Sequence, residues 1–292
     1  MKGEALVYDF GYGEVDSYRW INADGRTGGI VAASAMVADS ASIGEGAAIS
    51  PGAIIGEGAV IGDMTFIGYR ASIAAGVSIG DYARIGDMAV IGDMAVIGDY
   101  ARIGDMAVIG DMAVIGDRAV IGRGARIVLA VINPDAVIGE GAFISPGAII
   151  GEGAVIGDMT FIGEGAVIGE GAFLGYGASI GAFASVGSYA SIGFRASLGP
   201  DAIIGDDADI DAADWHMAGA CGSRGATWTA VHSRSHGLRW WVGCQRGIST
   251  EELLAAVQAT HGDNAHARAY RHAVQCIVTH PEYLRRVAAQ AE

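Results

Sequence analysis

A six-residue phrase, Gly-Asp-x-Ala-x-Ile, repeats six times in succession across residues 80–115. Beyond this stretch, a large aliphatic residue recurs at every sixth position from Val37 to Ile127, and after the loss of one residue the series resumes at Ile132 and runs to Ile210. Ala and Ile two positions apart would point to one side of a short strand, with the residue between them pointing outward. The Gly-Asp pair predicts a tight corner, since glycine tolerates unusual φ values. Three such strands close a triangle, so the repeat predicts a mainly β protein with about ten triangular coils.

The phrase resembles the hexapeptide repeat of the left-handed β-helix (transferase-like) superfamily over residues 31–212. The resemblance implies a left-handed parallel β-helix, against the usual right-handed crossover rule, and a homotrimer of parallel columns. We therefore expect three domains: an N-terminal cap at 1–30, the hexapeptide-repeat β-helix at 31–212, and a small C-terminal ββαα head domain at 213–292. The cap is rich in aromatic residues and has an alternative role as a binding surface: Tyr8, Phe10, Tyr12, Tyr18 and Trp20.

One face of the predicted column carries no charge. The outward residue of every third strand falls on the same face, and a strip ~48 Å long and ~15 Å wide covers on the order of 700 Å², more than the largest apolar patch usual on a monomer. We expect this face to be buried between subunits, although such columns also tolerate exposed valines. The predicted interface residues are Val60, Val96, Val114, Val131, Ile149, Val167 and Ile203.

A second face combines aromatic and cationic side chains. Tyr82 lies one coil before Tyr100, and Arg84 one coil before Arg102, so the four side chains could clamp a nucleotide or a sugar phosphate. The alternative is ordinary surface decoration with stacking between coils. The aspartates at the corners form ladders, which we interpret as corner residues that keep the column soluble; a weak cation site and mimicry of a DNA backbone are the alternatives.

Proton-transfer groups are missing from the repeat. Acyltransferases of the resembled superfamily generally depend on a histidine base, and its carbonic anhydrases use three histidines on zinc, whereas residues 31–214 contain no His, Cys or Lys. General-base catalysis therefore lacks its usual group, and fold alone does not establish function. We predict no catalytic residue, no metal and no cofactor.

The C-terminal residues resemble a module of uncharacterised phage and prophage proteins, through Gly-Ser-Arg-Gly at 222–225, Gly-Cys at 243–244 and His-Gly-Asp-Asn at 261–264. Cys244, His261 and Asp263 could form a nucleophile, a base and an orienting carboxylate. The alternative is a buried cysteine and a turn in which Asn264 caps a helix. Trp240 and Trp241 are expected in the core or at a subunit interface.

Charge and composition limit the partners. The formal net charge is −15, and clustered Lys and Arg are absent from the repeat, so we expect no direct nucleic-acid binding by the β-helix. No signal peptide and no membrane span are predicted, and the three cysteines suit a reducing compartment. We expect a protein of the host-cell cytoplasm or one associated with a virion.

These observations lead to one main functional expectation: a non-enzymatic, trimeric structural, adaptor or binding protein of phage type. The first alternative is a protein that sequesters a signalling nucleotide or mimics DNA, and the second is an acyltransferase. The expected partners are further copies of the chain, and a host or virion protein or a small nucleotide.

Overall fold

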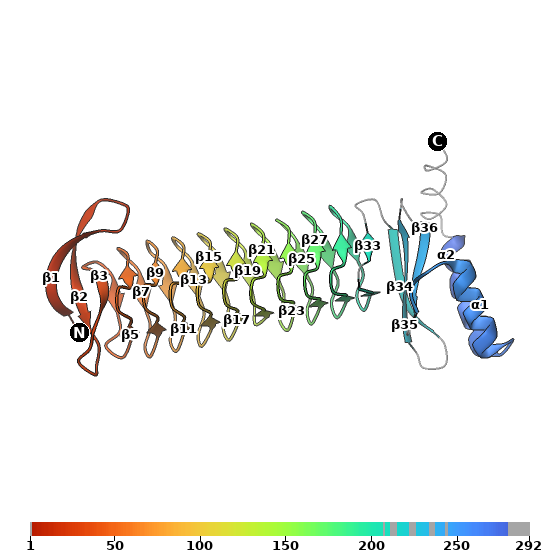
Figure 1. The fold of residues 1–292 in the computed structure, drawn as a ribbon, viewed down its shortest axis with the longest axis horizontal. Helices are drawn as coiled ribbons and strands as arrows, with labels where there is room; N and C mark the ends of the chain where they lie inside the picture. The colour runs from red at the N-terminus through yellow and green to blue at the C-terminus, as the bar shows by residue number, and fades with distance from the viewer. Residues whose placement is uncertain are drawn as a thin grey trace.

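The computed structural model describes residues 2–206, 208–210, 215–221, 226–233, 237–242 and 245–279. A long column of coils occupies the centre, with an antiparallel hairpin at its N-terminal end and a four-stranded sheet with two helices at its C-terminal end (Figure 1). Three parallel sheets, here called sheets A, B and C, form the walls of the column. Thirty strands of two residues each, β4 to β33, supply these walls.

From β3 onward each wall contains every third strand of the chain, and sheet A also includes the antiparallel strands β1 and β2. Sheet A contains β1 (Lys2–Asp9), β2 (Glu14–Ile21), β3 (Thr27–Ala32), β6 (Ala48–Ile49), β9 (Phe66–Ile67), β12 (Arg84–Ile85), β15 (Arg102–Ile103), β18 (Val120–Ile121), β21 (Val137–Ile138), β24 (Val155–Ile156), β27 (Phe173–Leu174), β30 (Ser191–Ile192) and β33 (Asp209–Ile210). Sheet B contains β4 (Met36–Val37), β7 (Ile54–Ile55), β10 (Ser72–Ile73), β13 (Val90–Ile91), β16 (Val108–Ile109), β19 (Arg126–Ile127), β22 (Phe143–Ile144), β25 (Phe161–Ile162), β28 (Ser179–Ile180) and β31 (Ser197–Leu198). Sheet C contains β5 (Ser42–Ile43), β8 (Val60–Ile61), β11 (Ser78–Ile79), β14 (Val96–Ile97), β17 (Val114–Ile115), β20 (Val131–Ile132), β23 (Ile149–Ile150), β26 (Val167–Ile168), β29 (Ser185–Val186) and β32 (Ile203–Ile204).

The interior of the column confirms the predicted alternation. The aliphatic anchors from Ile43 to Ile210 are at most 3% exposed, and most of the preceding alanines are fully buried. The residue between them faces outward, as at Val90, which is 43% exposed. Each anchor stacks on the anchor of the next coil in parallel register, as Ile73, Ile91 and Ile109 do. The core is therefore one continuous stack of isoleucines and alanines, whose burial stabilises the coils.

The corners differ from the predicted mechanism. The glycine that follows most anchors, such as Gly98, has no positive φ; a Cβ on Gly98 would lie 2.6 Å from the amide nitrogen of Asp117 in the next coil. This glycine is needed for close approach between coils. The left-handed backbone conformation belongs instead to a later corner residue, which is Gly58 in one coil and Met94 in another (φ 65° and 57°). Within the described part of the chain, sixteen residues other than glycine adopt positive φ.

The lost residue in the repeat shortens a single corner. Val108 pairs with Arg126, eighteen positions on, whereas Val114 pairs with Val131, seventeen positions on. The strands on both sides keep their parallel pairing, so the missing residue is absorbed between Ile127 and Val131 without breaking a wall.

Two distant segments of the column have almost the same sequence. Residues 43–68 and 138–163 are identical except for Ala48 in place of Phe143. The first segment begins on sheet C, in β5, and the second begins on sheet A, in β21. The same sequence therefore serves different walls.

Both ends of the column are covered. At the N-terminal end, β1 and β2 form an antiparallel hairpin that pairs with β3, and Phe10, Tyr18 and Trp20 join the column core. At the other end a fourth sheet, separate from the three walls, lies next to the last coils, where the Ile203 amide donates to the Thr229 hydroxyl (2.9 Å). This sheet contains β34 (Trp215–Cys221), β35 (Ala226–Ser233), β36 (Gly237–Val242) and β37 (Gln245–Ile248), two strands more than we expected.

Two helices follow this sheet, α1 (Thr250–His261) and α2 (Ala265–Val278). A capping box begins α1: the Ser249 hydroxyl accepts from the Glu252 amide, and the Glu252 carboxylate accepts from the Ser249 amide. Leu253 and Val257 of α1 share a buried cluster with Trp240 of the sheet. The C-terminal residues therefore have a core of their own.

Candidate ligand-binding groove

An open groove of about 560 Å³ lies between the tip of the N-terminal hairpin and the outer face of sheet A. Tyr12 contributes from the hairpin turn, and Arg123 from a corner of the column. The remaining side chains come from the outward positions of successive strands and from the corner that follows them: Phe66, Arg84, Asp87, Arg102, Asp105 and Val120. These eight residues define the groove.

Tyr12 connects the hairpin to the column. Its hydroxyl donates to Asp87 Oδ1, and its ring lies 6.0 Å from the ring of Tyr69, between ring centres. Burial raises the pKa of Tyr12 to about 12, and the hydrogen bond to Asp87 and the charge of that carboxylate add to the shift. The phenol therefore keeps its proton and holds the hairpin tip against the corner.

This contact gives a pH-dependent expectation. Because the folded pKa of Tyr12 is raised above the usual value near ~10, the stabilisation from the contact is complete below pH ~10 and is lost as the pH rises through about 12. The phenolate absorbance of the native protein minus that of a Tyr12→Phe variant should titrate near pH 12. A difference that titrates at ~10 would show that the contact does not form in solution.

Two arginines lie side by side along the groove. Arg84 of β12 and Arg102 of β15 are direct partners in the parallel register, and both are exposed. Among the described residues neither has an ion pair, although the Arg84 guanidinium lies 5.9 Å from the centre of the Phe66 ring. By contrast, Arg118 on another corner pairs with Asp135 at 2.6 Å, and its guanidinium lowers the pKa of that carboxyl group.

The carboxylates of the groove belong to a ladder that runs along the corners. Asp87 Oδ1 accepts from the Tyr69 amide (2.8 Å), and Asp105 Oδ1 accepts from the Asp87 amide (2.9 Å). The same bond to the preceding coil recurs at other corners, for example from the Asp81 amide to Asp99 Oδ1 (2.8 Å). Each such aspartate satisfies a backbone N–H that the coil geometry leaves without a strand partner. The ladder therefore has a structural role, as the corner interpretation supposed.

The four residues that we predicted as a ligand clamp form two stacked pairs, and their binding of one ligand stays a prediction. Tyr82 and Tyr100 stack on one another at the preceding corner, with ring centres 4.9 Å apart and planes within 2°. They do not line the groove, whereas Arg84 and Arg102 do. Sequence reasoning missed Phe66, Arg123 and the two aspartates, because the partner on which the groove depends is Tyr12, far away in the chain.

The predicted interface residues all lie on sheet C with exposed side chains. Their exposed fractions range from 37% at Val131 to 48% at Val60, and the intermediate values belong to Val96, Val114, Ile149, Val167 and Ile203. Their burial between subunits stays a prediction.

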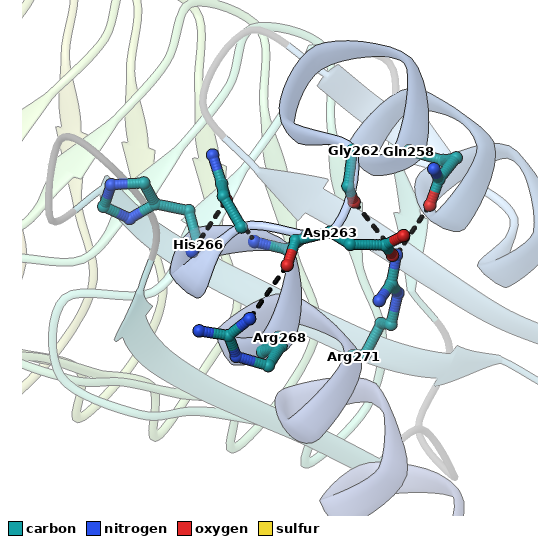
Figure 2. Close-up of polar contacts among 8 residues, drawn as sticks. Gln258, Gly262, Asp263, His266, Arg268 and Arg271 are labelled. Atoms are coloured by element: carbon teal, nitrogen blue, oxygen red, sulfur yellow. Dashed lines mark hydrogen bonds and ion pairs between the residues drawn. The ribbon is translucent and has the colours of Figure 1, made fainter.

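Of the imagined triad the structure describes His261 and Asp263, and each of these two side chains contacts another residue. Asp263 Oδ1 accepts from Arg271 (2.8 Å; Figure 2), and the Asn264 side chain caps α2 by accepting from the amides of His266 and Ala267. His261 instead stacks on Tyr270, with ring centres 6.0 Å apart. Cys244 lies outside the described residues, as does the side chain of Trp241. Trp240 is a core residue, 1% exposed, whose Nε1 donates to Thr250.

Within the described ranges, no group of three or more His, Cys, Asp or Glu side chains could hold a metal ion. No described helix is long and apolar enough to cross a membrane.

Comparisons with known proteins show which fold this is. The family model described as the GMPPB C-terminal domain matches residues 31–113 and 94–175. The UDP-N-acetylglucosamine O-acyltransferase of Moraxella catarrhalis is similar in structure, with 22% identity over 55% of this chain and 70% of that one and a TM-score of 0.53. The UDP-N-acetylglucosamine acyltransferase of Campylobacter jejuni has 24% identity over 51% of this chain and 66% of that one, with a TM-score of 0.50. No curated protein matches the chain.

These findings correct the main functional expectation. A non-enzymatic structural, adaptor or binding protein of phage type is the wrong conclusion, because the matched structures are acyltransferases. The absence of histidine from the repeat, on which that expectation rested, excludes one kind of base and not the reaction itself. The resemblance of the C-terminal residues to phage proteins stays a prediction.

Proposed function

We propose that this chain, which has the left-handed β-helix fold of the hexapeptide-repeat acyltransferases, transfers an acyl group from a thioester to a hydroxyl or amino group. The observation that carries the proposal is the groove under Tyr12. There, arginine and aspartate side chains meet an aromatic hairpin on an otherwise regular column. The arginines suit an anionic substrate and the aspartates suit a proton acceptor.

The chemistry assigns the base to a carboxylate. The acceptor's oxygen or nitrogen attacks the thioester carbonyl carbon and gives up its proton, the C–S bond breaks, and the thiolate takes a proton as it leaves. Because residues 31–214 contain no imidazole, thiol or amine, the groove has no other strong proton acceptor than its aspartates. Asp87 already accepts from Tyr12, so we assign the base to Asp105, which uses only Oδ1 in the ladder.

The proposal also includes self-association. The uncharged residues of sheet C form a straight strip from Val60 to Ile203. Packing this strip against other copies would remove it from water, and we propose a homotrimer, in keeping with the trimers known for this fold.

The activity can be tested with the full chain. Acetyl-CoA would be mixed with acceptors that include UDP-N-acetylglucosamine, and the released thiol measured over time. We expect turnover, and we expect Asp105→Asn to lower kcat by ~10²-fold or more, as loss of a general base does. The matched control is Asp99→Asn, which alters the same ladder bond at another corner, outside the groove.

Two outcomes would count against the proposal. If no acyl-CoA releases thiol in the presence of any acceptor, the chain is not an acyltransferase of this kind. If His261→Ala abolishes turnover while Asp105→Asn retains it, the reaction belongs to the C-terminal residues and the groove assignment is wrong.

A further inference from the structure

The groove carries an uncompensated positive charge. Residues 31–214 contain seven arginines and 23 acidic residues, yet three of those seven arginines line this groove together with only two aspartates. The groove residues therefore sum to +1, three positive charges minus two negative ones. Arg123 stands where the phrase places an aspartate, after Asp87 and Asp105 of the two preceding coils. The departure from the repeat adds a cation at the groove itself.

The two central arginines repel one another as they stand. Arg84 and Arg102 are direct neighbours on adjacent parallel strands, which are ~4.8 Å apart. Like charges directly opposite on neighbouring strands are destabilising. Among the described residues, no carboxylate pairs with Arg84, Arg102 or Arg123. A ligand with adjacent negative charges would remove this repulsion on binding.

From this arrangement we propose that Arg84, Arg102 and Arg123 form a binding site for two adjacent phosphate groups, the pyrophosphate part of a nucleotide or of a coenzyme. Each guanidinium presents a planar set of N–H donors that matches phosphate oxygens. The spacing of one strand places the two groups side by side, as a pyrophosphate requires.

Aromatic side chains continue the site on the N-terminal side. Phe66 is the outward neighbour of Arg84 in the preceding coil, and the Arg84 guanidinium already lies over its ring. Tyr12 overhangs the same side from the hairpin, and its hydroxyl is held by Asp87. A flat base or an apolar arm attached to the pyrophosphate would meet these two rings, so the site has one phosphate-binding part and one aromatic part.

The inference rests on the proposed function only for the role of the ligand: coenzyme A, the carrier of the acyl group in that function, contains a pyrophosphate. Binding itself needs no acyl transfer. The site is therefore tested by calorimetry on the full chain without an acyl acceptor, with inorganic pyrophosphate, ADP, coenzyme A and adenosine as separate probes.

We expect pyrophosphate, ADP and coenzyme A to bind and adenosine to bind at least ~10-fold more weakly. The double variant Arg84→Ala/Arg102→Ala should weaken the binding of the phosphate-bearing probes by ~10²-fold or more, because it removes two charge-assisted contacts. Binding should also weaken as salt is added. The comparison of ADP with coenzyme A distinguishes the two sources of the phosphate groups: tighter binding of coenzyme A indicates a coenzyme, and equal or tighter binding of ADP indicates a nucleotide.

The matched control is Arg126→Ala. Arg126 is exposed at an outward strand position like Arg84, but it lies on sheet B, away from the groove. An equal loss of binding in this variant would show a general charge effect and overturn the site, as would a failure of all three phosphate-bearing probes to bind. Binding that depends on Arg84 and Arg102 without thiol release keeps this site and refutes the acyltransferase proposal; thiol release without such binding does the reverse.

Discussion

Replacing Ile91 by aspartate is expected to unfold the central coils of the column. Ile91 is fully buried and stacks between Ile73 and Ile109 in the parallel ladder. Removing a buried isoleucine costs about 2–5 kcal/mol, and an unpaired buried carboxylate adds a penalty of several kcal/mol more. Together these approach the whole stability of an ordinary domain, about 5–15 kcal/mol. Circular dichroism and urea unfolding of Ile91→Asp would measure the loss.

The matched control changes the adjacent residue in the same way. Val90 precedes Ile91 in β13 and is 43% exposed on the outer face of sheet B. Val90→Asp should therefore shift the free energy of unfolding by no more than about 0.5 kcal/mol, as surface substitutions do. Equal losses in the two variants would contradict the alternation of inward and outward residues on which the whole column depends.

A second large loss is expected from Gly98→Ala, although it adds only one methyl group. The added Cβ would lie 2.3 Å from Asp117 Oδ1 and 2.6 Å from the Asp117 amide nitrogen. Both coils continue through strands on either side, so the clash cannot be relieved by moving one side chain. We expect the free energy of unfolding to fall by about 3 kcal/mol or more, at or above the usual cost of overpacking. Thermal and urea unfolding would measure the change.

Gly58→Ala is the control for Gly98→Ala. Gly58 has a positive φ of 65°, and no atom lies within 4 Å of the place a Cβ would take. The cost there is only the left-handed backbone conformation, about 1–2 kcal/mol. Met94 already occupies the equivalent corner position with a φ of 57°. If Gly58→Ala proved the more damaging variant, our division of corner glycines into close-approach and left-handed positions would be wrong.

The column could be predicted because its signal is local. An Ala and an Ile two positions apart define a strand face without reference to any distant residue, and thirty such phrases specify the walls and about ten coils. The role of the corner glycine was not predicted correctly. Its constraint is the Asp117 backbone of the following coil, which the six-residue phrase does not contain.

The candidate site was predicted only in part, for the opposite reason. Arg84 and Arg102 stand out because they interrupt a run of valines. Tyr12 is one of five aromatic residues of the cap for which a binding role was an alternative, but nothing in the first thirty residues shows that the hairpin turns back to reach Asp87, 75 positions along the chain. Tyr82 and Tyr100 share the sequence neighbourhood of the arginines but lie at the corner before them and do not line the groove.

The near-identical segments 43–68 and 138–163 show that the unit of growth is one phrase and not one coil. Since the same residues start on sheet C in one place and on sheet A in the other, the phrases of this segment fit more than one wall. Adding three phrases between the groove and the C-terminal helices would lengthen the axis by ~4.8 Å and preserve their mutual orientation. Adding one phrase would instead rotate everything downstream by a third of a turn about the column axis. The direction in which the C-terminal helices face therefore depends on the remainder when the number of phrases is divided by three.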